Sequence, residues 1–106
     1  MAGRRAPTHL SPSTAAWWRS VVGSYELEEH HQRLLTLACE AFDRCEEARE
    51  ALAQHGLVTV DGNGNPKPRP EFAIERDSRL AFARLVRELD LDGEPGPEPR
   101  IPRRVG

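Results

Sequence analysis

The sequence predicts a mainly α-helical fold: a short N-terminal helix, one long central helix, a β-hairpin and a final helix. Three observations support this prediction. Apolar residues recur at alternating four- and three-residue spacing over residues 27–52, helix-start and helix-stop signals bound the helical segments, and a strong turn sequence follows the long helix. A flexible basic N-terminal arm (1–10) and a Pro/Gly-rich, disordered C-terminal tail (93–106) are expected on either side of one helical domain (11–92).

Size and composition are those of a single small domain. The chain has 106 residues, 38% hydrophobic and 30% charged, with a net charge of −2. No apolar run approaches the length of a membrane span, and no signal-peptide core follows Arg4 and Arg5, so we expect a cytoplasmic protein without membrane contact. Cys39 and Cys45 lie about 9 Å apart along one helix, too far for a disulfide, and we expect two buried thiols.

The first helix is expected to begin with Ser11 as its N-cap and Pro12 at its first position, a pairing that favours helix initiation. It should run to about Val22. Trp17 and Trp18 are adjacent on it, and packing of at least one of the two rings into the core is the more frequent outcome for such a pair.

The second helix, from Leu27 to His55 with Gly56 as its C-cap, is the longest predicted element. Its apolar stripe comprises Leu27, His31, Leu34, Ala38, Ala41, Cys45, Ala48 and Leu52. Antiparallel packing within one subunit is the commoner fate of such a stripe. The rest of this chain is too short to cover it fully, so we expect the stripe to form an oligomer interface, where its small central residues allow close helix approach.

The remaining elements are a hairpin and a last helix. Leu57–Val60 has β-strand composition, and Asp61–Gly64 is a strong hairpin turn. The return stretch over residues 65–70 has proline at alternate positions and can pair only as a short edge strand. Pro70 suits the first turn of a final helix that runs to about Leu89.

Catalytic motifs are absent from the sequence. The stretch that begins at Asp61 resembles the start of a calcium loop, but its twelfth position, which needs an acid, is Phe72. His30 and His31 should point to different faces of the long helix, and no second histidine follows four residues later to complete a zinc pair. We therefore expect no metal, no cofactor and no enzymatic activity.

Charge is distributed in blocks along the chain. Eight acids lie between Glu26 and Glu50, whereas both ends are basic. Phosphate contacts need cations that reach out from a rigid body. The candidates for contacts with nucleic acid are Arg4, Arg5, Arg19, Lys67, Arg69, Arg76 and Arg79.

Several stretches together resemble the small terminase subunits of tailed bacteriophages. They are Leu10-Ser11-Pro12, Trp18 with Tyr25-Glu26-Leu27, residues 37–41, Ala48-Arg49, Gly56-Leu57-Val58, and residues 68–77 running into Phe82 and Leu85. The stretch 68–77 is the most specific part, and the resemblance covers roughly residues 10–92.

This resemblance implies an oligomeric ring that binds viral double-stranded DNA and regulates the large terminase subunit, the ATPase and nuclease, during genome packaging in an infected bacterial host cell. The helical domain would then serve both oligomerisation and DNA packaging, although no clear helix-turn-helix is present. Two alternatives stay open. One is a helical protein–protein adaptor that never binds nucleic acid, and the other is a small metal-dependent enzyme that uses His30 or His31.

Overall fold

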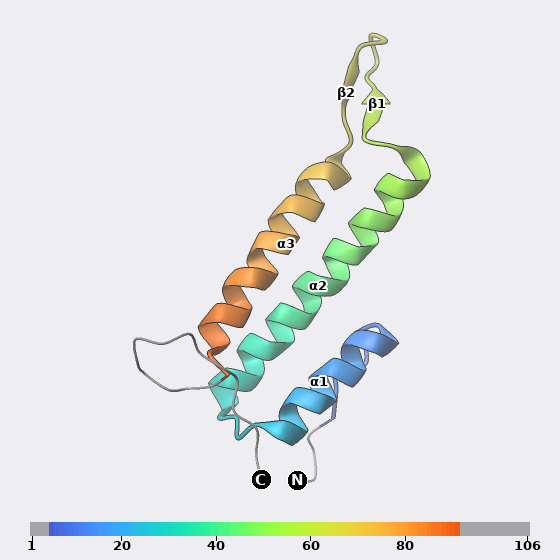
Figure 1. Cartoon of the computed structure of the whole chain (residues 1–106). Coiled ribbons are helices and arrows are strands. Elements are labelled where there is room, and N and C mark those ends of the chain that lie inside the picture. Colours follow the sequence, from blue (N-terminus) through green and yellow to red (C-terminus); the bar gives the residue numbers. More distant parts are fainter. Residues whose placement is uncertain (1–4, 92–106) are drawn as a thin grey trace.

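The computed structural model describes residues 5–91, and Figure 1 shows their arrangement. The elements follow in the order α1 (Pro12–Ser24), α2 (Glu29–His55), β1 (Val58–Val60), β2 (Pro66–Pro68) and α3 (Pro70–Leu89). The predicted fold class and element order are therefore confirmed. Arg4 and the predicted tail over residues 93–106 lie outside the described residues.

Helix α1 begins as its sequence predicts. The Ser11 hydroxyl accepts a hydrogen bond from the Thr14 amide at 3.3 Å, and Pro12 occupies the first turn. The helix ends at Ser24, two residues later than expected, with the Tyr25 amide donating to the Val21 carbonyl. Leu10, in the segment before the helix, is buried in the core.

Helix α2 begins at Glu29 and not at Leu27, because Glu28 keeps an extended backbone and acts as the N-cap. The Glu28 amide donates to Nδ1 of His31 at 3.2 Å, which satisfies one of the unpaired amides at the helix start. At the other end Gly56 has a φ of 85°, a backbone region that side chains with a Cβ rarely adopt. The predicted stop at His55 is confirmed.

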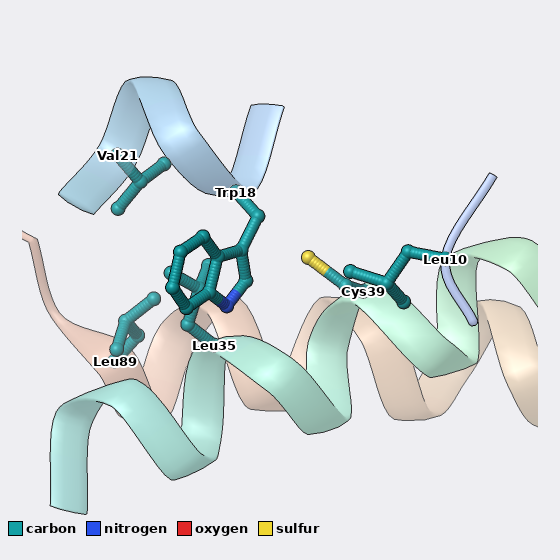
Figure 2. Packing of buried hydrophobic residues seen from close by; sticks show 6 residues of the cluster. All are labelled: Leu10, Trp18, Val21, Leu35, Cys39 and Leu89. Atoms are coloured by element: carbon teal, nitrogen blue, oxygen red, sulfur yellow. The ribbon is translucent and has the colours of Figure 1, made fainter. Parts of the chain in front are cut away.

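The three helices share one core. In Figure 2, Trp18 and Val21 of α1 lie over Leu35 of α2 and Leu89 of α3, with Cys39 and Leu10 alongside. The indole nitrogen of Trp18 donates to the Thr36 hydroxyl at 3.2 Å, so the buried ring also has its polar atom satisfied. In Figure 1, α2 and α3 run side by side, and α1 packs against the half of this pair that lies away from the hairpin.

The hairpin projects beyond the ends of α2 and α3 (Figure 1). Its antiparallel register pairs Thr59 with Lys67. One carboxylate oxygen of Asp61 accepts hydrogen bonds from the Asn63 and Asn65 amides, each at 2.9 Å, so this acid closes the turn. Among residues 5–91, no helix is long and apolar enough to span a membrane.

Candidate functional site

Within residues 5–91, the cationic candidates fall into two groups. Arg5 and Arg19 belong to the segment before α1 and to α1 itself, whereas the other four lie on β2, at the start of α3 and along it. Those four are Lys67, Arg69, Arg76 and Arg79. The hairpin and α1 lie toward opposite ends of the α2–α3 pair in Figure 1, so a single subunit does not bring all the candidates together.

Lys67 and Arg69 stand at the base of the projecting hairpin. Lys67 is exposed, and Arg69 is half-buried as the N-cap residue of α3, where its amide donates to the Leu57 carbonyl at 2.9 Å. Within residues 5–91, neither side chain forms an ion pair. Nε of Arg69 is buried with no hydrogen-bond partner, as is one carboxylate oxygen of Glu71. No acid among residues 5–91 therefore neutralises these two cations.

Arg76 and Arg79 differ from Lys67 and Arg69 because each forms an ion pair with an acidic side chain. Nε of Arg76 lies 3.0 Å from the Asp77 carboxylate, and Nε of Arg79 lies 3.4 Å from that of Glu75. Arg49 of α2 also reaches Glu75, at 3.2 Å. The hydrogen bond from Arg49, together with the nearby charge of Arg79, holds the pKa of Glu75 below its usual range. Arg76 and Arg79 thus have internal partners that a phosphate would have to replace.

The apolar stripe of α2 is covered in part from within the subunit. Ala38, Cys45 and Ala48 are buried, and the Cys45 thiol lies 3.6 Å from the Glu75 carboxylate of α3. The small side chains of α2 therefore receive α3 of the same chain, as antiparallel packing requires. The other stripe residues remain half-buried, and they are Leu27, His31, Leu34, Ala41 and Leu52.

Both cysteines are buried free thiols, as expected. Burial, together with the nearby carboxylates of Asp43 and Glu40, raises the pKa of the Cys39 thiol to about 12. Burial also raises the pKa of Cys45. A thiol that stays protonated is a poor nucleophile and a poor metal ligand, so these side chains serve packing.

His30 and His31 lie close together, and the prediction that they point to different faces of α2 is wrong. Their ring centroids are 4.1 Å apart, because His31 turns back to accept the Glu28 amide in the first turn of the helix. The donor atoms of Glu28, His30 and His31 all lie within 4.8 Å of one another. Glu28 and His30 are exposed and His31 is half-buried, and the group lies at the positive end of the helix dipole, which disfavours a bound cation.

An aromatic groove between the helices is the feature that sequence reasoning missed. Phe42 of α2 and Phe82 of α3 have ring centroids 5.3 Å apart, and Trp17 of α1 lies 6.1 Å from Phe82. With Ser13 and Thr14 these rings line a hollow of about 360 Å³. Trp18 is buried and Trp17 only half-buried, which agrees with the expectation that at least one of the two rings packs inside. The signal in the sequence that could have indicated this groove is the pair of adjacent tryptophans, whose side chains leave a helix about 100° apart.

Comparison with known proteins identifies one family. The family model described as "Phage terminase, small subunit" matches residues 15–95. No curated protein and no solved structure matches the chain. The matched range includes all three helices, apart from the first turn of α1, and the whole hairpin.

Proposed function

Because the chain belongs to the phage terminase small-subunit family, we propose that it is the oligomeric DNA-recognition component of a phage packaging machine. In this role it binds viral double-stranded DNA and regulates the large terminase subunit, which supplies the ATPase and nuclease activities. The small subunit itself is then not an enzyme and needs no cofactor. It works in the cytoplasm of the infected host cell, away from membranes.

The observation that carries the DNA-binding part is a pair of cations that form no ion pair within residues 5–91: Lys67 on strand β2 of the projecting hairpin and Arg69 where the hairpin meets α3. A projecting basic element can reach the phosphate backbone while the helices stay clear of it. Arg5 and Arg19 supply further cations without acid partners in the described part of the chain. Arg4 would extend this group, and Arg76 and Arg79 would contribute only by exchanging their acid partners for phosphate.

Self-association is supported by apolar surface at the hairpin end of the molecule. Leu57, Val58 and Val60 are each more than half exposed, and the exposed Phe72 lines one hollow with Leu57 and Val58. A two-stranded hairpin is marginally stable alone, so partner contacts would stabilise it. The half-buried residues of the α2 stripe remain a candidate interface as well. Assembly also repeats each cation around the oligomer and raises avidity for DNA without any new kind of contact.

Two measurements on the full chain test the proposal. Light scattering is expected to give a multimer of defined mass, and retention of double-stranded DNA is expected to fall steeply as salt rises from about 50 to about 200 mM. Lys67→Glu should weaken the retention of DNA. It should also reduce the steepness of the plot of log binding constant against log salt concentration, by roughly 0.9 for each phosphate that the assembly no longer neutralises.

Arg44→Glu is the matched control, because Arg44 is also exposed and makes no ion pair within the described residues, but lies on the acidic helix α2. It should retain DNA like the unaltered protein. A multimer that ignores DNA at every salt concentration would instead favour the protein–protein adaptor. A monomer would contradict the oligomeric part.

A further inference from the structure

The aromatic groove has an acidic rim. At its end near the N-terminus of α1 it continues, through Ser13 and Phe42, into a second hollow. The residues along that hollow are His9, Ser11, Ser13, Phe42, Asp43, Glu46, Glu47 and Glu50. Phe42 remains 38% exposed although its ring packs on Phe82. The surface thus combines an apolar floor with negative charge, and it is suited to a segment that presents one apolar side chain among cations.

A matching surface lies on the outer side of α3. Leu80 is 54% exposed, a large value for an apolar side chain in the middle of a helix. Arg84 and Arg87 follow it at four and seven residues, so the three side chains share one face of the helix. Neither arginine forms an ion pair within residues 5–91. We call Leu80, Arg84 and Arg87 the basic ridge.

The groove and the basic ridge of one chain cannot meet. Phe82 lines the groove, and Leu80, two residues away, leaves α3 about 200° from it around the helix. The ridge therefore faces away from the groove that Trp17, Phe42 and Phe82 line. Two different surfaces on opposite sides of a subunit form a head-to-tail contact, and repetition of such a contact gives a ring when the rotation closes.

We propose that the basic ridge of one subunit docks on the acid-rimmed aromatic groove of a second copy of this chain. Leu80 enters the groove between Phe42 and Trp17, while Arg84 and Arg87 lie against Glu47 and Glu50. Opposite charges bring the two surfaces together in one orientation, and the apolar contact supplies affinity. This inference rests on the proposed oligomeric function, and it names one pair of surfaces, without which neighbouring subunits do not stay together.

Charge reversal tests the pairing in the full-length protein. The groove variant is Glu47→Lys with Glu50→Lys, and the ridge variant is Arg84→Glu with Arg87→Glu. In either variant alone, groove and ridge carry like charges, so each is expected to run as a monomer at a concentration at which the unaltered protein is assembled. An equimolar mixture of the two should reassemble with the variants alternating, because every groove then meets a ridge of opposite charge; a closed ring of this kind has an even number of subunits. The same recovery is expected when all four substitutions are placed in one chain.

The matched control is Glu26→Lys with Glu29→Lys, which makes the same change of charge near the start of α2, about 27 Å along the helix from Glu47. It should assemble normally. If both variants keep the unaltered mass, or if neither the mixture nor the fourfold variant recovers it, the pairing is wrong while oligomerisation stands. If the unaltered protein is itself a monomer, the oligomeric function fails together with the pairing. Helical circular dichroism of each variant distinguishes a disrupted interface from an unfolded chain, and recovery in the mixture also excludes misfolding.

Discussion

Asp43 joins α1 to α2, and replacing it with asparagine tests how the two helices are held together. One carboxylate oxygen accepts the Ser11 amide at 2.8 Å, and the other accepts the hydroxyls of Ser11 at 2.9 Å and Thr14 at 2.6 Å. An asparagine can keep the two hydroxyl bonds, but its NH₂ group then faces the Ser11 amide, which is also a donor. A hydrogen bond to a charged group contributes about 1.5–3 kcal/mol, so we expect Asp43→Asn to lower the free energy of unfolding by roughly that amount.

The effect of pH on the same variant gives an independent check. Partial burial raises the pKa of the Asp43 carboxyl, but the hydrogen bonds from Thr14 and Ser11 outweigh it, and the folded-state pKa lies below its ordinary value. A depressed pKa means that the carboxylate stabilises the fold fully above the unfolded-state pKa of about 4, and that this stabilisation is lost as the pH falls through the folded-state pKa. The difference between the two proteins should therefore be constant above about pH 5 and shrink below about pH 4.

Urea unfolding followed by circular dichroism measures both effects, at one fixed protein concentration because self-association shifts apparent stability. Thr14→Val removes one hydroxyl donor, and its cost should be smaller in the Asp43→Asn background than in the unaltered protein, since the two residues share a bond. A change below about 0.5 kcal/mol on Asp43→Asn, or a difference independent of pH, would refute the reasoning.

Three further predictions concern single positions. Gly56→Ala should lower the free energy of unfolding by about 1–2 kcal/mol, because the positive φ of this position strains a residue with a Cβ. No steric clash should add to this strain, since nothing lies within 4 Å of the added Cβ, and an unchanged melting temperature would contradict the prediction. In a Cys45→Ser background, the Cys39 thiol should not react with a maleimide at pH 8 until urea unfolds the protein, because burial raises its pKa to about 12. Rapid labelling of the folded protein would be inconsistent with the burial of Cys39. Added Zn²⁺ should leave the melting temperature unchanged, and a rise that His30→Ala abolishes would establish a metal site at the start of α2.

Several elements could be predicted because their signals are local. Ser11 and Pro12 start α1, Gly56 ends α2, and Pro70 starts α3, each through backbone conformation or amide pairing within a few residues. The turn at Asp61 is equally local, since its carboxylate binds amides two and four residues ahead. Such interactions depend little on the rest of the fold.

The candidate site was predicted less well, because its properties depend on contacts between distant residues. Charge alone could not separate Lys67, which makes no ion pair within residues 5–91, from Arg79, which Glu75 holds. The distinction depends on helix packing, which also brings Arg49 of α2 to the same carboxylate. The proximity of His30 and His31 depends on a side chain turning back to Glu28, which an ideal helical wheel does not represent.

The sequence by itself determined the helices, the hairpin and their order, and through residues 15–95 it determined the family. Only the tertiary structure decided which surfaces are covered and which are open. The heptad spacing of α2 predicts an apolar stripe but does not name its partner, and in the structure the buried Cys45 of this stripe lies against Glu75 of α3 in the same chain. The groove formed by Trp17, Phe42 and Phe82 exists because three helices meet at particular angles, and helical periodicity within one segment carries no information about those angles.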